Sequence, residues 1–320
     1  MNQTPQERPA APLLIFDIET VPDIPLLYMH YEPALEGGWD VSRDWRDVCV
    51  PEAIRVQKNL NFPPPIFHCV ISICALFVDP ETNQIIDGFR KSVPVPQSYA
   101  ELLSGEAQLL RDFWAFTIKK KDKLKNWYDS LQSDFRMSDY QRRKLKPIPL
   151  TFCGYNISGF DLPVLEQRSM RNFITCPIPE YGREWGYDSY RSKYAFDKCF
   201  DLLHYISGNA VGRSGLDILA RSMGLGGKMT GMDGSRVAAE YYENRAWEKI
   251  EEYCAVDVLI TYGVYLALQK FRGFLDAQQF RECAHQFLLF LNKEGKPAAY
   301  AELARESHAF FAAADSDTLK

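Results

Sequence analysis

The 320-residue sequence lacks several features that would place it at once in a class of proteins. None of its eight cysteines forms a C-x-x-C pair, and its five histidines are scattered, so no zinc-ligand spacing is present. No apolar stretch reaches the length of a membrane span, and no signal peptide is recognisable, because the short apolar run at 12–16 ends in Asp17. Repeats and low-complexity segments are also missing. We therefore expect a cytoplasmic protein with reduced core cysteines and no membrane partner.

The composition is that of an ordinary soluble protein, but its charge is unevenly distributed. Hydrophobic residues make up 46% and charged residues 25%, and the formal net charge is −5, which argues against a protein coated in nucleic acid. Segment 119–146 holds ten Lys and Arg against four Asp, a charge of +6, so the rest of the chain carries −11. Aromatic residues lie among these cations. The segment therefore suits contact with single-stranded nucleic acid, or else forms a solvated helix face.

The hydrophobic pattern predicts a mixed α/β sheet, because strands come early and helices lie between and after them. We expect strands at 12–18, 66–78, 84–93, 149–155 and from 196, and helices at 99–118, from 161, at 215–223, 234–244 and 245–271, with two more in 276–313. Residues 1–11 are expected to be a loose tail. Residues 28–65 read as an irregular insertion, either a lid or binding loop with Trp39 and Trp45 as candidates for base stacking, or a surface insertion.

Two acids interrupt the first predicted strand. Asp17 and Glu19 are two residues apart, so their side chains share one face of the strand. Carboxylates among apolar neighbours are costly unless they are paired or bound to a metal. The pair therefore indicates a platform for a divalent ion such as Mg²⁺ or Mn²⁺, or alternatively a strand end with two solvated acids.

Three further positions carry polar groups in apolar surroundings. Tyr253 and Asp257 are four residues apart in a strongly helical segment, which places them on one helix face. Either the phenol orients a water while the carboxylate holds a metal, or the two belong to an ordinary amphipathic helix with Tyr253 packed and Asp257 exposed. Asp161 leads a helix and is either a site residue or an N-cap. Asn156 ends a strand, where its amide could fix the loop or a ligand. For Asp201 we favour helix capping over the role of an accessory acid.

Taken together, these motifs resemble the DEDD 3′–5′ exonucleases, which have an RNase H-like (DnaQ-like) fold. The order Asp-x-Glu, Asn-x-x-x-Phe-Asp and Tyr-x-x-x-Asp is that of the tyrosine subclass, since the histidine subclass would have His at the position of Glu252. The local sequences at 16–20, 155–161, 227–228 and 250–258 resemble most a bacterial group of predicted exonucleases related to the proofreading domain of family-B DNA polymerases. The resemblance covers about residues 12–272.

The resemblance implies a fold, a cofactor and roles for named residues. It implies a five-stranded mixed sheet flanked by helices in an exonuclease domain at 12–272, with insertions near 28–65 and 119–146 and a C-terminal helical extension at 273–320. Two divalent metal ions, Mg²⁺ or Mn²⁺, would be bound by the four acids, and Tyr253 would position the attacking water. The metal ligands would be Asp17, Glu19, Asp161 and Asp257, and the substrate-binding residues Thr20, Asn156, Phe160, Gly227 and Lys228.

The glycine-rich segment 223–228 has two interpretations. It is not a Walker A loop, because Met229 follows Lys228 where Ser or Thr is required. General considerations favour a turn that ends a helix. The family resemblance favours instead a contact of backbone N–H groups and Lys228 with a substrate phosphate.

We therefore expect a metal-dependent 3′–5′ exonuclease. Its partner would be nucleic acid with a free 3′ end, single-stranded and with DNA favoured over RNA, and its products nucleoside 5′-monophosphates. The alternatives are a 3′–5′ exoribonuclease and a catalytically silent module that binds nucleic acid. A phosphatase of the haloacid-dehalogenase type is only faintly indicated, because Glu19 stands where that class has its second Asp. Which protein partners it has is not indicated by the sequence.

Overall fold

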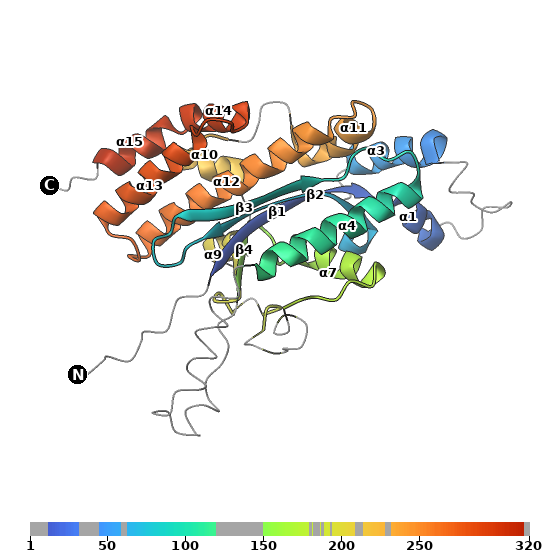
Figure 1. The fold of residues 1–320 in the computed structure, drawn as a ribbon, viewed down its shortest axis with the longest axis horizontal. Helices are drawn as coiled ribbons and strands as arrows, with labels where there is room; N and C mark the ends of the chain where they lie inside the picture. Colours follow the sequence, from blue (N-terminus) through green and yellow to red (C-terminus); the bar gives the residue numbers. More distant parts are fainter. Residues whose placement is uncertain are drawn as a thin grey trace, which may run out of the picture.

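A five-stranded mixed sheet forms the centre of the computed structural model (Figure 1). The structure describes residues 12–31, 45–58, 63–119, 150–178, 181, 186, 189–192, 194–208, 214–227 and 232–316. The strands are β1 (Leu13–Pro22), β2 (His68–Val78), β3 (Ile85–Ser92), β4 (Thr151–Gly154) and β5 (Cys199–Asp201), in the spatial order β3-β2-β1-β4-β5. The first three strands are antiparallel, whereas β4 runs parallel to β1 and to β5. The predicted mixed α/β, RNase H-like fold is confirmed.

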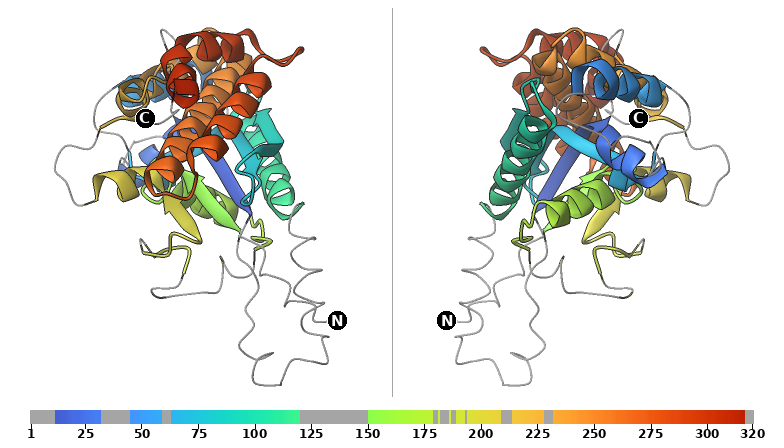
Figure 2. Two further views of the ribbon diagram at one scale, coloured as in Figure 1. Left: turned by 90° about the vertical axis from the view of Figure 1, so that its left-hand side faces the viewer. Right: turned by 90° about the vertical axis from the view of Figure 1, so that its right-hand side faces the viewer.

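Alternation along β1 separates two apolar layers, one on each face of the sheet. Leu14, Phe16 and Ile18 pack with α4 (Tyr99–Ile118) and α7 (Asp161–Arg171). Leu13 and Ile15 face α12 (Trp247–Phe271) on the opposite side. Figure 2 shows the two groups of helices on either side of the sheet. Because successive side chains of a strand point to opposite faces, Asp17 and Glu19 belong to the face that α12 covers.

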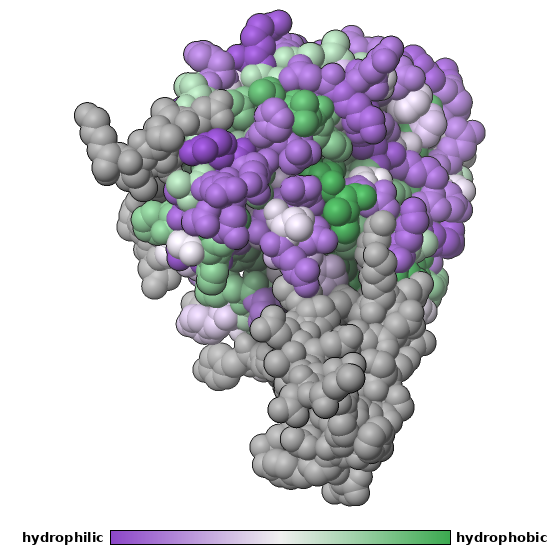
Figure 3. Space-filling view, turned by 60° about the vertical axis from the view of Figure 1, so that its left-hand side comes forward, coloured by the Kyte–Doolittle hydropathy of each residue, from purple (hydrophilic) through white to green (hydrophobic). Residues whose placement is uncertain are grey.

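Helix α12 is the central helix of the larger layer. It is long and apolar enough to cross a membrane by composition, which the sequence analysis did not anticipate. Within the protein, however, 83% of its most apolar window is buried, as expected for the core helix of a globular domain. Hydrophilic residues cover most of the described surface seen in Figure 3, with small apolar patches between them.

The C-terminal segment forms three helices where two were predicted. These are α13 (Ala277–Leu291), α14 (Ala298–Glu306) and α15 (His308–Ser316). The break before α14 includes Gly295 with φ 79° and Pro297 at the N-cap, and Ser307 ends that helix. Helices α13 and α14 pack against α12, α15 packs against α13 and α14, and a single apolar cluster contains residues from β1, α12 and these helices. The domain boundary at 272/273 stays a prediction.

The insertion near 28–65 is not irregular where the structure describes it. It contains the end of α1 (Ile24–Tyr31), a π-helical turn at Trp45–Cys49 and α3 (Val50–Lys58). Trp45 is buried between Tyr99 and Tyr242, so the prediction that it stacks on a substrate base is wrong. Residues 1–11, Trp39 and almost all of the basic segment 119–146 lie outside the described residues.

The remaining elements connect the sheet to α12. They are α9 (Leu202–Ser207), α10 (Leu216–Ser222), a 3₁₀ turn at Gly234–Arg236 and α11 (Val237–Tyr242). A second 3₁₀ turn, Pro65–Phe67, leads into β2. Helix α11 packs against both β1 and α12 near the N-terminal end of α12, which is the end that carries Tyr253 and Asp257.

Candidate metal-binding active site

Strand β1 places two carboxylates beneath α12. Asp17 lies opposite Cys74 of β2 and Glu19 opposite Ser72, and the register shifts directly after Glu19. Glu19 is 8% exposed and Asp17 is half-buried. A carboxylate oxygen of each lies within 4.8 Å of the other and of the Cys254 sulfur. Two carboxylates this close repel each other, and a bound cation removes the repulsion.

Helix α12 contributes three polar groups to the same place. Tyr253 is 1% exposed and Asp257 4% exposed, so both are buried against the sheet. The Cys254 thiol donates to the backbone carbonyl of Asp17 at 3.3 Å. Burial raises the pKa of Tyr253 well above its ordinary value, and the charges of Asp257, Glu19 and Asp17 raise it further. The phenol therefore shares one electrostatic environment with three of the four predicted ligands.

Asp161 reaches the site from the edge of β1. Strand β4 pairs with β1 only at Leu13–Ile15, so beyond that point the β4 side of β1 has open backbone groups. Asp161 Oδ1 accepts the N–H of Ile18 there at 3.3 Å. Asp161 is the first residue of α7 and not its N-cap, which is Phe160 without a side-chain cap bond. The N-cap alternative is wrong, and burial raises the pKa of Asp161 to about 7.

Asp201 holds the loop that leads to Asp161. It accepts hydrogen bonds from the backbone N–H groups of Asn156 and Ser158, each at 3.0 Å, and from the Ser158 hydroxyl. It also caps α9 by accepting the N–H of His204 at 3.2 Å, so the favoured capping role is confirmed. Asn156 has φ 67°, a left-handed conformation that Asn tolerates. Its predicted contact with substrate stays a prediction.

A glycine allows this loop to turn close to the sheet. A Cβ on Gly154 would lie 2.2 Å from the Ile157 side chain and 2.8 Å from the carbonyl oxygen of Phe16. Any larger residue at the end of β4 would therefore push the loop, and with it Asp161, away from β1.

Thr20, the residue after Glu19 in β1, and Phe160 meet at a buried histidine, His68. The Nε2–H of His68 donates to the carbonyl of Pro63 at 3.0 Å, so Nδ1 is the acceptor for the Thr20 hydroxyl, also at 3.0 Å. The ring of Phe160 stands edge-on to the imidazole, with centroids 5.0 Å apart. Burial lowers the pKa of His68 to about 4, which keeps it neutral. The predicted role of both residues in substrate binding stays a prediction.

The glycine-rich segment is a turn that ends α10, as general considerations favoured. Gly224 has φ 77°, and its N–H donates to the carbonyl of Arg221 at 3.0 Å. The Gly226 N–H donates to the Ser307 hydroxyl at 2.8 Å, so the turn docks on the C-terminal helices. In the described part of the chain, no hydrogen bond or ion pair joins Gly227 to the four acids. Lys228 lies outside the described residues.

A buried ion-pair network fixes α7. The guanidinium of Arg168 contacts Asp23 at 2.7 Å, at the end of β1, and Glu106 of α4 at 2.6 Å. All three side chains are at most 1% exposed. Removing one partner of such a network leaves an uncompensated buried charge. The network therefore sets the axis of α7, which carries Asp161 at its first turn.

Sequence reasoning missed Cys254, because all cysteines were interpreted as core residues. The available signal was its spacing: Cys254 lies three residues before Asp257 and so on the same side of the helix. It also missed the Arg168 network and His68, for which no local pattern exists.

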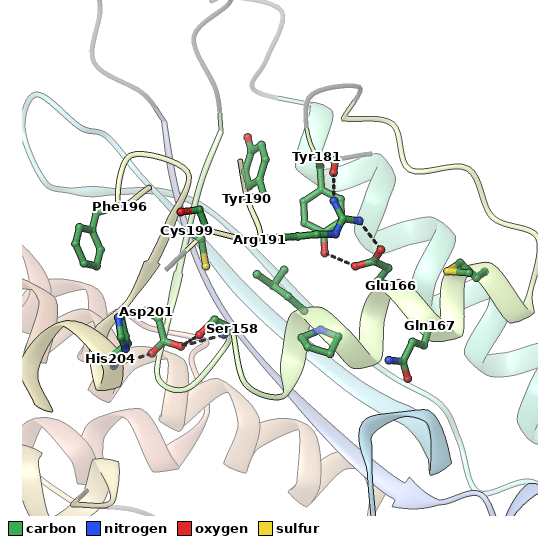
Figure 4. A pocket seen from close by; sticks show the side chains of 14 residues that line it. Ser158, Glu166, Gln167, Tyr181, Tyr190, Arg191, Phe196, Cys199, Asp201 and His204 are labelled. Carbon is green, nitrogen blue, oxygen red and sulfur yellow. Dashed lines mark hydrogen bonds and ion pairs between the residues drawn. The ribbon is translucent and has the colours of Figure 1, made fainter. Parts of the chain in front are cut away.

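A cavity of about 570 Å³ lies behind the loop that Asp201 holds (Figure 4). Ser158 and Asp201 form one side of it, and Tyr181, Arg191 and Glu166 form another, with the Arg191 guanidinium paired with Glu166. None of the four predicted metal ligands lines this cavity. It therefore adjoins the candidate site through the loop and through the first turn of α7, where Leu162 and Pro163 line it.

The strand order and the helices on both faces define an RNase H-like α/β protein. The sequence then identifies the family, because residues 143–307 match the family described as "Predicted 3'-5' exonuclease related to the exonuclease domain of PolB". The chain belongs to this family of 3′–5′ exonucleases. The matched part includes Asp161, Tyr253 and Asp257 but not β1. No curated protein matches the chain.

Two solved structures show a distant likeness. The family B DNA polymerase of the archaeon Pyrobaculum calidifontis is 15% identical with a TM-score of 0.44, over 90% of this chain and 31% of the polymerase. E. coli Exonuclease I in complex with an oligonucleotide is 15% identical with a TM-score of 0.31, over 85% of this chain and 42% of that one. The chain thus spans less than half the length of either.

Proposed function

We propose that this protein is a metal-dependent exonuclease that hydrolyses phosphodiester bonds at the 3′ end of single-stranded nucleic acid, preferably DNA, and releases nucleoside 5′-monophosphates. The observation that supports this most is the convergence of groups from three distant segments. Asp17 and Glu19 from β1, Asp161 from α7, and Tyr253 and Asp257 from α12 surround one stretch of β1.

The donor set fits two hard divalent cations. Carboxylate oxygens are the preferred ligands of Mg²⁺ and Mn²⁺, and four carboxylates supply the negative charge that two such ions require. We propose Asp17, Glu19, Asp161 and Asp257 as the ligands. Bound ions would supply water activation and stabilisation of the leaving oxygen.

The residues of the chain would orient the reactants. We propose that the Tyr253 phenol, whose pKa is raised by burial and which is protonated at neutral pH, donates a hydrogen bond to the attacking water. Asp161 is held by the Ile18 N–H, which fixes its carboxylate before any ligand binds. We propose that Phe160, half-exposed beside His68, contacts the terminal nucleotide, with Thr20, Asn156, Gly227 and Lys228 as further substrate contacts.

Degradation of labelled oligonucleotides tests the proposal. Single-stranded DNA, duplex DNA and RNA would be compared with Mg²⁺, with Mn²⁺ and with EDTA. We expect 5′-labelled single-stranded DNA to shorten from its 3′ end only when metal is present. Asp17→Ala and Asp257→Ala should lower the rate by more than about a hundredfold, beyond the usual effect of residues that only support a metal ligand, while circular dichroism shows an intact fold.

The same assay separates the alternatives. Faster degradation of RNA than of DNA would identify an exoribonuclease. Binding without cleavage under every metal condition would identify a silent nucleic-acid-binding module and overturn the proposal. Release of inorganic phosphate from a small monoester would identify a phosphatase.

A further inference from the structure

A basic groove lies on the other side of α12 from the carboxylates. We use this name for Arg90 of β3, Phe290 of α13, Tyr300 of α14, and Lys293 and Lys296 between those two helices. These residues line a cavity of about 430 Å³ whose walls are β2, β3, α12, α13 and α14. The volume is in the range of pockets that hold small ligands.

The sheet register places this groove near the candidate active site. Asp17 pairs with Cys74, and Cys74 pairs with Arg90, so these three residues stand in one row across β1, β2 and β3. Cross-strand neighbours point to the same face, and two strand spacings amount to about 10 Å. Arg90 therefore lies on the same face of the sheet as Asp17, two strands away.

The groove has more positive than negative charge. Arg90 pairs with Glu251 at 3.1 Å, whereas Lys293 and Lys296 make no ion pair with any acid in the described ranges. Asp87 at the rim is itself paired with Lys119 at 3.6 Å. Partial burial and the neighbouring charges of Lys293 and Arg90 lower the pKa of Lys296. A bound anion would remove this repulsion among like charges.

Aromatic rings hold the cations in place. The Lys296 ammonium lies 4.2 Å from the centre of the Phe290 ring and 5.9 Å from that of Tyr300. The Arg90 guanidinium lies 5.7 Å from the same Tyr300 ring. The two rings stack on each other at 26°, with centroids 6.3 Å apart. Cations positioned over aromatic faces are a recurring way to contact the backbone and bases of single-stranded nucleic acid.

We infer that the basic groove binds a nucleotide phosphate of the nucleic-acid strand outside the hydrolytic site. This inference deepens the proposed function and rests on it for the identity of the ligand. It also gives α13, α14 and the connection between them a task, because together they supply four of the five groove residues. A free nucleoside monophosphate, the proposed product, also carries a phosphate group. The test below therefore distinguishes binding of the nucleic-acid strand from binding of the released product.

Binding without hydrolysis tests the inference directly. The affinity of labelled oligodeoxythymidylate is measured by fluorescence anisotropy in EDTA, at several salt concentrations, for wild type and Lys293→Ala/Lys296→Ala. We expect at least about tenfold weaker binding at low salt, and a slope of log K against log salt shallower by about 1.4, because each lost phosphate contact on a single strand accounts for about 0.7.

Two matched variants control for charge and fold. Arg55→Ala/Arg305→Ala removes the same charge from exposed residues that do not line the groove, and it should bind as wild type does. Lys293→Arg/Lys296→Arg keeps the charge and should restore affinity and slope. Unchanged binding by Lys293→Ala/Lys296→Ala would overturn the inference. An equal loss of affinity in Arg55→Ala/Arg305→Ala would also overturn it.

Competition by thymidine monophosphate identifies the source of the phosphate. We expect it to compete weakly, and equally weakly in wild type and in Lys293→Ala/Lys296→Ala. Strong competition that the substitution abolishes would identify released product as the ligand and overturn the inference for the strand. Hydrolysis of p-nitrophenyl thymidine monophosphate with Mn²⁺ tests the proposed function separately, because this ester is too small to span both sites.

Discussion

Asp161 accepts a hydrogen bond from the backbone N–H of Ile18 at 3.3 Å, although 143 residues separate the two. Ile18 lies between Asp17 and Glu19, so this bond ties the start of α7 to the strand that carries two of the other three acids. The bond is possible because β4 stops pairing with β1 after Ile15. Divergence of two parallel strands thus creates the place where the carboxylates meet.

Asp161→Asn should stabilise the metal-free protein at neutral and higher pH. Burial raises the pKa of Asp161 from 3.8 to about 7. Ionising it therefore costs folding free energy, so stability is lost as the pH rises from about 4 to about 7. Asparagine keeps an acceptor for Ile18 without charge. Thermal unfolding in EDTA should show a gain of about 1 kcal/mol or more above pH 7, since one pKa unit corresponds to about 1.4 kcal/mol, and no gain below pH 4. The same pH dependence in both proteins would contradict this.

Asp201→Asn should weaken metal binding through the loop before Asp161. The amide offers one acceptor oxygen where the carboxylate serves Asn156, Ser158 and His204. We expect about 1–3 kcal/mol lower stability and a cleavage rate about 10–100-fold lower that more Mn²⁺ partly restores. The control is Asp276→Asn, which makes the same exchange at the N-cap of α13 and should not alter the Mn²⁺ requirement. If Asp201→Asn requires the same Mn²⁺ concentration as wild type, Asp201 contributes to the stability of the fold but not to metal binding.

Tyr253→Phe should slow cleavage by about a hundredfold and leave oligonucleotide affinity nearly unchanged, because it removes one oriented O–H donor and keeps the ring. Single-turnover rates and anisotropy measure the two effects. Tyr262→Phe is the matched control on the same helix, since its hydroxyl donates to the backbone carbonyl of Asn83, between β2 and β3, at 2.7 Å. Equal losses of rate and affinity in Tyr253→Phe would indicate a packing role.

Cys254 should make the site sensitive to thiophilic metals. Its sulfur lies within 4.8 Å of oxygens from Asp17 and Glu19, a mixed donor set that suits Cd²⁺ or Zn²⁺ better than Mg²⁺. Titration with Cd²⁺ should produce the ultraviolet charge-transfer band of a thiolate complex, absent in Cys254→Ser but present in Cys283→Ser. Cleavage with Mg²⁺ should survive in Cys254→Ser. If the charge-transfer band persists in Cys254→Ser, the Cys254 thiol is not the Cd²⁺ ligand.

The sequence predicted the parts of the fold that depend on local pattern. The strands on either side of Asp79–Asn83 were predicted because their alternation and turn residues are local, and β2 and β3 confirm them. Helices α4 and α12 were predicted in the same way, from apolar spacing. The third C-terminal helix was missed because a single residue, Ser307, separates it from α14.

Contacts between distant segments could not be predicted. Gln57 of α3 donates to the Thr20 carbonyl at 2.9 Å, yet nothing in the region around Gln57 indicates that it packs on β1. The pairing of Arg168 with Asp23 joins residues 145 apart by side-chain geometry alone. The convergence of the acids was predicted only through the order of the motifs and the family resemblance, because periodicity places each acid on a face but not beside another segment.

Mn²⁺ binding measured by electron paramagnetic resonance tests the central claim most directly. With a nucleoside 5′-monophosphate present, the account predicts two bound Mn²⁺ ions per wild-type chain, and fewer in Asp17→Ala and Asp257→Ala that retain the wild-type circular dichroism spectrum. If wild type binds no Mn²⁺, or if both variants bind as many ions as wild type, these carboxylates do not form a metal site.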